Sequence, residues 1–170
     1  MAQDTRAYRG PSEDRNLNLR FEESGRSYGR RLRRRMADEC IFCKIVAREL
    51  PATIIGEDDR TLAFMDISPA TRGHALVIPR EHASDLHEIG PEDLKAVAAT
   101  AQRVAAKARD RLGADGVNLL HSSGAAAWQT VFHFHVHVIP RYADDPLKLP
   151  WVPAPGDMDE IAAAGAQLAS

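Results

Sequence analysis

Three histidines alternate with apolar residues in the segment 131–139: His133, His135 and His137. Successive side chains of a β-strand point to opposite faces, so this spacing predicts three imidazoles on one side of a strand. Neighbouring rings would lie roughly 6.6 Å apart, because each residue rises about 3.3 Å. The buried side of the strand would be formed by Phe132, Phe134, Val136 and Val138. With an ordinary pKa of about 6.5, each ring could attack a substrate, carry a proton or bind a metal.

Three interpretations of this row compete. It could be a polar strand face in solvent, or a metal site, because two histidines at alternate positions can present ligands to zinc or iron. It could also perform nucleophilic catalysis on phosphorus, with one ring attacking and the others carrying protons or charge. The surroundings favour phosphorus. The loop 122–127 consists of small residues that let a backbone approach a phosphate, Gln129 and Thr130 can donate hydrogen bonds, and Arg141 follows the row.

Four further motifs accompany the row in a fixed order. They are CIFCKI at 40–45, LAFMD at 62–66, GHALVIPREH at 73–82 and QTV at 129–131. Together they span about residues 39–142 and make the sequence similar to the histidine-triad (HIT) superfamily of nucleotide hydrolases and transferases, in particular to its Hint branch. The resemblance implies an α+β fold with an antiparallel five-stranded sheet, one long and one short helix, and a homodimer in which two sheets become continuous.

The resemblance also implies catalytic roles. The middle histidine of the triad, His135, would attack the α-phosphorus of a nucleotide and form a nucleotidyl-histidine that water hydrolyses. His137 would stabilise the phosphoryl oxygens, and Thr130 would contact the phosphate or the leaving group. His74 would support the triad through hydrogen bonding. Side chains and backbone amides can neutralise the phosphate here, so no catalytic metal and no organic cofactor are expected.

Nucleotide binding is implied at a partly overlapping set of positions. Asp66 would bind the ribose hydroxyls, and Phe64 and Ile67 would form walls of the base pocket. The complete expected set is Phe64, Asp66, Ile67, His121, Gln129, Thr130, His135 and His137. Two positions depart from the pattern, because many Hint-like proteins carry asparagine where this chain has His121 and glycine where it has Trp128. We expect Trp128 to narrow the leaving-group side of the pocket.

The chain contains two cysteines, Cys40 and Cys43, in Cys-x-x-Cys spacing. A disulfide across so small a loop would be strained, and the βαβ context of a redox motif is absent. Free buried thiols and half of a zinc site remain. The resemblance extends to bacterial HIT proteins whose zinc ligands fall on Cys40, Cys43, His82 and His133. Four such ligands would close a tetrahedron, so this zinc would be structural, with His133 as a ligand.

Charge and composition divide the chain into three parts. Residues 1–35 hold ten arginines against five acids, a net +5 in a chain of net −2, so the remainder carries −7. We expect an arginine-rich disordered tail at 1–35, a HIT domain at 36–145 and a proline-rich extension at 146–170. The tail could bind nucleic acid, could be a solvated segment without specific use, or could lie upstream of a true start at Met36.

Apolar periodicity and turn residues predict the elements of the domain. A short helix is expected at 41–48 and a long one from Pro91, with Gly113 ending it. A third helix is expected near the C-terminus at 158–168. Strands are expected at 54–57, 62–66, 75–78, 117–120 and 131–139. Trp151 could lie near a partner subunit's site or cover its own subunit's core.

The sequence therefore predicts a cytoplasmic, homodimeric enzyme that releases a purine nucleoside 5′-monophosphate from a small leaving group, most readily across a P–N bond. No apolar run approaches the ~20 residues of a membrane span. Three alternatives stay open. They are cleavage of dinucleoside polyphosphates as in the fragile-histidine-triad branch, a purine-nucleotide-binding regulator with little turnover, and removal of adenylate from DNA ends with help from the tail.

Overall fold

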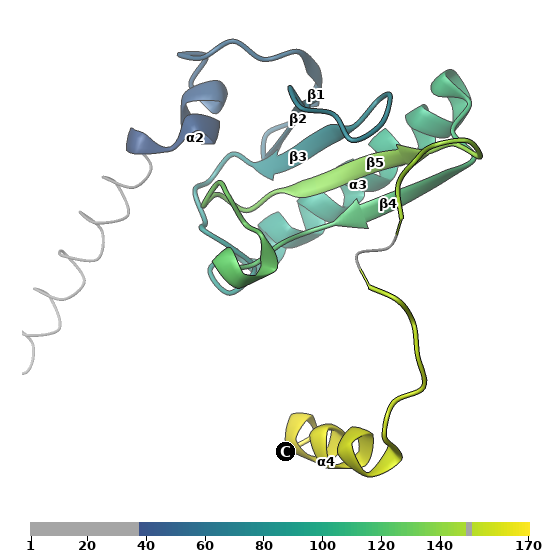
Figure 1. Ribbon diagram of the computed structural model, residues 1–170. Coiled ribbons are helices and arrows are strands. Elements are labelled where there is room, and N and C mark those ends of the chain that lie inside the picture. The colour runs from purple at the N-terminus through teal and green to yellow at the C-terminus, as the bar shows by residue number, and fades with distance from the viewer. Residues whose placement is uncertain (1–37, 149–150) are drawn as a thin grey trace, which may run out of the picture.

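The computed structural model describes residues 38–148 and 151–170, and the predicted N-terminal tail at 1–35 lies outside them. Five antiparallel strands form one sheet in the order β1-β2-β3-β5-β4 (Figure 1). Their bounds are Ile54–Glu57, Thr61–Met65, Ala75–Pro79, Gly116–Leu120 and Val136–Arg141 for β1 to β5. β1, β2 and β3 follow one another in the chain and pair in that order, through connections at 58–60 and 66–74, while β5 inserts between β3 and β4. The expected α+β fold with a five-stranded antiparallel sheet is confirmed.

One face of the sheet is covered by the long helix α3 (Pro91–Leu112), which lies behind the strands in Figure 1. Pro91 occupies the first turn, where its missing N–H costs nothing, and Gly113 ends the helix in the left-handed region at φ 67°. The core between helix and sheet includes Ala63, Ala75, Val77, Val97, Ala101, Val104, Phe134 and Val138. Small residues dominate this layer, so α3 packs closely on the strands.

The opposite face of the sheet is covered in part by the short helix α2 (Ile41–Val46). Its one buried side chain is Phe42, which contacts the ring of Phe64 edge-on at a centroid distance of 5.5 Å. The second core layer consists of Phe42, Leu62, Phe64, Leu76 and Ile78. Strand residues of β2 and β3 thus alternate between the two layers, as the pleat requires.

The expected strand at 131–139 is wrong over its first half, because β5 begins only at Val136. The backbone hydrogen bonds of the preceding residues go elsewhere: the N–H of His133 donates to Val131 O, and that of Phe134 donates to Ala83 O. Phe132 is 47% exposed, so it does not belong to the predicted buried face. His133, Phe134 and His135 are all buried, so the alternation of histidine and apolar residues in the sequence does not correspond here to an exposed and a buried face of a strand.

The C-terminal extension carries the helix α4 (Met158–Leu168), as predicted. Asp157 caps it by accepting hydrogen bonds from the N–H groups of Asp159 and Glu160. All side chains of α4 are exposed, and so is Trp151. Within the described parts of the chain, none of the helices combines the length and the apolar character needed to cross a bilayer.

Candidate active site

Four polar side chains meet on the face of the sheet opposite α3. His137 of β5 lies directly across from Leu76 of β3, and His74 lies two residues before Leu76, so both histidines point to the same side. Asp66 follows β2 and also faces this side, with a carboxylate oxygen 3.6 Å from His74 Nε2 and 3.9 Å from His137 Nδ1. The His135 ring completes the group, with its centroid 5.0 Å from that of His137.

Main-chain atoms determine which ring nitrogens of His74 and His137 carry protons. The N–H of Ala70 donates to His74 Nδ1 over 3.0 Å, so this nitrogen is unprotonated and the neutral ring carries its proton on Nε2. His74 Nε2–H then donates to His137 Nδ1 over 2.9 Å. His137 must therefore carry its own proton on Nε2. Its free N–H is the only polar hydrogen of the ring available to a bound ligand.

The tautomer of His135 is fixed in the opposite sense. Its Nδ1 lies 2.6 Å from the carbonyl oxygen of His133, which can only accept, so Nδ1 carries the proton. Nε2 of His135 is left with a free lone pair. The site thus places a nucleophilic nitrogen on His135 beside a hydrogen-bond donor on His137.

Burial keeps these rings neutral. It lowers the pKa of His137 to about 4, and the neighbouring His135 and His74 act in the same direction, against the carboxylate of Asp66. Burial also lowers the pKa of His135 and of His74. The expectation of ordinary imidazole titration near pH 6.5 is therefore corrected. At neutral pH the rings are uncharged, as nucleophilic attack by imidazole requires.

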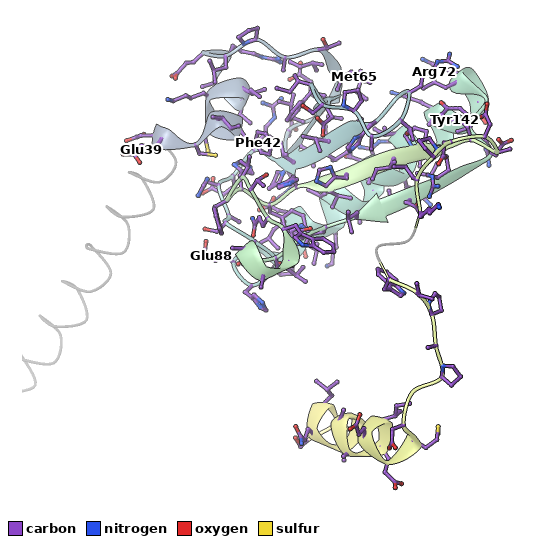
Figure 2. All side chains as sticks on the ribbon, in the orientation of Figure 1. Glu39, Phe42, Met65, Arg72, Glu88 and Tyr142 are labelled. Atoms are coloured by element: carbon purple, nitrogen blue, oxygen red, sulfur yellow. The ribbon has the colours of Figure 1, made fainter. Side chains whose placement is uncertain are left out.

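A cavity of about 430 Å³ opens beside these rings. Among the residues expected to bind a nucleotide, its lining contains Phe64, Asp66, Ile67, Thr130, His135 and His137. The remaining lining residues were not expected from the sequence motifs; they are Ile41, Phe42, Ile45, Leu50, Pro51, Ala52, Met65, Leu76 and Val131. Most come from α2 and the loop after it, and Figure 2 shows Phe42 on the side of α2 that faces the sheet. The apolar residues of the short helix, spaced as one helical face, were the available signal.

Two residues of the expected nucleotide-binding set lie outside this lining. His121 Nδ1–H donates to the carbonyl oxygen of His135 over 2.8 Å, so it holds the main chain of the triad. Gln129 is buried and its amide is fully engaged, accepting from the Gly124 N–H and donating to Ser84 O and Val131 O. Both side chains position the loop that leads into the triad.

Arg141, at the end of the triad segment, also points elsewhere. Its guanidinium binds the carboxylate of Asp145 over 2.7 Å and the side-chain oxygen of Asn118 over 2.7 Å. Asp66 is thus the one Asp, Glu, Lys or Arg side chain among the described residues that line the cavity, which agrees with the expectation that uncharged groups neutralise the phosphate. Neutral N–H donors take the place of positive side chains.

A second cluster lies next to the first, where α2 approaches the triad. The ligand atoms of Cys40, Cys43, His82 and His133 all lie within 4.8 Å of one another. Cys43 Sγ is 3.3 Å from His82 Nδ1 and 3.5 Å from His133 Nδ1, and Cys40 Sγ is 3.5 Å from His133 Nδ1. The structure therefore brings together the four residues that the sequence analysis assigned to zinc.

The geometry of this cluster fits a tetrahedral zinc ion. With Zn–S near 2.3 Å and Zn–N near 2.0 Å, the sulfur–nitrogen edges of the tetrahedron measure about 3.5 Å. His133 Nε2–H donates to Pro79 O over 3.0 Å, which leaves Nδ1 free to bind a metal. Burial and the neighbouring Cys40 raise the pKa of Cys43 to about 12, so two thiolates here need a cation beside them.

Phe42 connects the two clusters. It lies between Cys40 and Cys43 in the chain, and its ring contacts His133 edge-on at 5.9 Å and His135 at 5.3 Å. The same ring lines the cavity. The position of α2 thus affects both the four-ligand cluster and the packing around the nucleophilic nitrogen.

Comparisons with known proteins agree with this arrangement. The profile of the HIT domain matches residues 47–144. The adenosine 5′-monophosphoramidase of Schizosaccharomyces pombe is 39% identical over 132 residues, which cover 77% of this chain and 96% of that protein. Several other relatives are named only as uncharacterised HIT-like proteins, such as one from Methanocaldococcus jannaschii that is 41% identical over 110 residues, which cover 62% of this chain and 81% of that protein.

Solved structures extend the comparison to the fold. A HIT family member from Bacillus subtilis superposes with a TM-score of 0.72 at 36% identity, covering 77% of this chain and 95% of that one. A zinc-bound histidine triad family protein from Mycobacterium smegmatis gives a TM-score of 0.64 at 45% identity, covering 78% and 97%. From the family profile, which spans more than half of the sequence, and from these relatives, the chain belongs to the HIT domain family.

Proposed function

We propose that this protein hydrolyses adenosine 5′-phosphoramidates and related purine nucleoside 5′-monophosphate derivatives through a nucleotidyl-histidine on His135. The observation that carries the proposal is the fixed pair of tautomers at the cavity. His135 presents an unprotonated Nε2, and His137 presents Nε2–H beside it. The S. pombe relative, named as an adenosine 5′-monophosphoramidase, supports the choice of a P–N bond.

The reaction divides into two displacements at the α-phosphorus. In the first, His135 Nε2 forms a bond to phosphorus while the P–N bond breaks, and the leaving nitrogen takes up a proton from solvent, which the attacking water returns in the second step. In the second, water attacks the phosphorus and releases His135. One water is consumed overall: its hydroxide completes the monophosphate and its proton goes to the amine. His137 Nε2–H and the Thr130 hydroxyl donate to the phosphoryl oxygens as charge builds on them.

Binding of the nucleoside part uses the apolar end of the cavity. Phe64, Ile67 and Phe42 enclose a flat purine ring, and Asp66 accepts hydrogen bonds from the ribose hydroxyls. The carboxylate of Asp66 is anchored by the N–H of Ser68 over 2.7 Å, so it is held in place before a ligand arrives. We assign positioning roles to His74, His121 and Gln129.

We further propose that Cys40, Cys43, His82 and His133 hold a structural zinc. The zinc-bound M. smegmatis relative supports this. We propose a homodimer as well, in which β4 edges pair. β4 is an outer strand of the sheet, and its Leu119 and Leu120 are 54% and 44% exposed. A purine nucleotide is the expected ligand, and the N-terminal tail offers the expected route to nucleic acid.

The test compares wild type with His135→Gly, both with excess EDTA, on an adenosine 5′-phosphoramidate. We expect turnover by wild type and a loss of at least a thousandfold in the variant, because the lining of the cavity holds no other imidazole nitrogen with a free lone pair. His87→Gly is the matched control, since His87 is exposed and outside the site. Equal turnover by His135→Gly would refute the nucleophile. AMP binding without turnover by wild type, with or without EDTA, would favour a nucleotide-binding regulator.

A further inference from the structure

Trp128 has an unusual backbone for its size. Its φ of 67° and ψ of 23° lie in the left-handed region, which large side chains rarely adopt. Among the described residues outside glycine, only Arg48 shares a positive φ. Such a conformation costs on the order of 1–3 kcal/mol and persists only where the surroundings enforce it. Since the indole is 70% exposed, core packing does not explain its presence.

The loop around Trp128 is held firmly from both sides. The N–H of Trp128 donates to Ala125 O over 3.0 Å, and the N–H of Gln129 donates to Gly124 O over 3.2 Å. The buried amide of Gln129 adds hydrogen bonds to Gly124 and Ser84. These contacts fix the main chain from which the exposed indole extends.

This position adjoins the reacting end of the cavity. Thr130 lines the cavity beside His135 and His137, and two residues of chain span at most about 7 Å. Trp128, Thr130 and Phe132 are all exposed and alternate with buried Gln129 and half-buried Val131. Two exposed aromatic rings therefore flank the threonine that faces the phosphate. We name Trp128 and Phe132 the aromatic rim.

We infer that Trp128, assisted by Phe132, recognises the leaving group, and that the favoured leaving group carries a flat aromatic ring. This inference rests on the proposed function. Attack by His135 expels the leaving group on the side of phosphorus opposite Nε2. The rim residues precede and follow Thr130 by two positions in the chain and are exposed, so their rings are available to a group that leaves past the threonine. Two chemistries fit: an arylalkyl amine, or the second nucleobase of a dinucleotide.

The experiment measures preference as a ratio of kcat/KM. One substrate is the adenosine 5′-phosphoramidate of 2-(indol-3-yl)ethylamine, and the other is that of propylamine. We expect wild type to prefer the aromatic amine about tenfold, which corresponds to about 1.4 kcal/mol of stacking. Trp128→Phe should keep several-fold preference, while Trp128→Ala and Trp128→Gly should bring the ratio close to one.

The three variants separate the ring from the backbone. Phe and Ala keep a side chain on a backbone in the left-handed region, whereas Gly removes the strain of that conformation. If Phe and Ala behaved alike and differed from Gly, loop geometry would control the ratio and the inference would be overturned. An unchanged ratio in all three variants would overturn it as well. Absence of turnover on both substrates by wild type would instead count against the proposed function.

A second pair of substrates distinguishes the two leaving-group chemistries. The two substrates are ATP and diadenosine triphosphate. Both contain three phosphates, and the dinucleotide adds a second adenosine with its base. A wild-type preference for the dinucleotide that disappears in Trp128→Ala assigns the rim to a nucleobase. Preference confined to the indole amine assigns it to an arylalkyl amine. No ring-dependent preference in either pair contradicts the inference.

Discussion

Single atoms of the main chain determine the chemistry of this site. The Ala70 N–H and the His133 carbonyl place one proton on each of three rings and leave one lone pair facing the cavity. We predict that His74→Phe lowers kcat at least tenfold with little change in KM, because His137 loses the donor that fixes its tautomer. His74→Gln should recover part of the rate, since its amide can donate to the same nitrogen.

Steady-state kinetics of the two variants beside His87→Phe, an exposed control, would check this prediction. A rise in KM with unchanged kcat would contradict it, because that pattern signals lost substrate binding. Equal losses in His74→Phe and His74→Gln would also contradict it, since they would show that volume matters and donation does not.

At the same scale, the sequence predicted which side chains gather here but could not assign their protons. His135, His137, Asp66 and Thr130 share the cavity, as their motifs implied. The tautomers depend on backbone atoms that a pattern of residue types does not reveal. Gln129 is the clearest difference: a donor next to Thr130 suggested a ligand contact, yet its amide is consumed by the main chain.

At the scale of elements, α2 couples the four-ligand cluster to the cavity. Its Phe42 and Ile45 line the pocket, and Cys40 and Cys43 lie at its start. We predict about one zinc per chain by elemental analysis. Removing it by chelation or by Cys43→Ser should raise KM about fivefold or more and lower Tm, because α2 loses its attachment to the triad segment.

Readdition of zinc to the chelated wild type should restore both values, and Lys44→Ser, a substitution within α2 outside the cluster, serves as a control. Zinc content below a tenth of an equivalent in freshly prepared protein would contradict the assignment. A full zinc complement whose removal leaves KM unchanged would contradict the coupling through α2.

Element boundaries followed the sequence well where local chemistry decides them. Pro91 and Gly113 delimit α3 as expected. The expected start of the triad strand is wrong because strand pairing depends on residues far away in the sequence. β3 pairs with β5 only from Val77↔Val136 to Ala75↔Val138. Before that point the backbone turns to bond Ala83, which no periodicity within the segment could indicate.

At the scale of the whole molecule, buried neutral histidines make stability depend on pH. His137 has a pKa of about 4 in the folded protein, against about 6.5 when unfolded, so unfolding takes up a proton between these values. The free energy of unfolding should therefore fall as pH drops from 6.5 toward 4, by up to about 1.4 kcal/mol per pH unit for this group. Urea titrations at several pH values should show that the free energy of unfolding changes less per pH unit in His137→Gln than in wild type. An identical change per pH unit would refute the prediction.

The proposed dimer is also a property of the whole molecule. We predict a sedimenting species of twice 18.7 kDa at micromolar concentration. Leu119→Lys together with Leu120→Lys should shift it toward the monomer, because like charges would face each other across paired β4 edges. Leu168→Lys on the exposed α4 is a matched charge control. A monomeric wild type would refute the dimer.

The relay from Ala70 through His74 to His137 has a direction. Its inner end is an amide, which cannot release its proton at neutral pH, so nothing behind His74 can refill the relay. A proton lost from His137 could therefore be replaced only at its outer nitrogen, Nε2, by water in the cavity. Protons can therefore enter or leave this hydrogen-bonded chain only at the mouth of the cavity. Because the proposed reaction uses His137 only as a hydrogen-bond donor, the same proton can serve successive turnovers, and exchange with solvent at the mouth of the cavity matters only if that proton is lost.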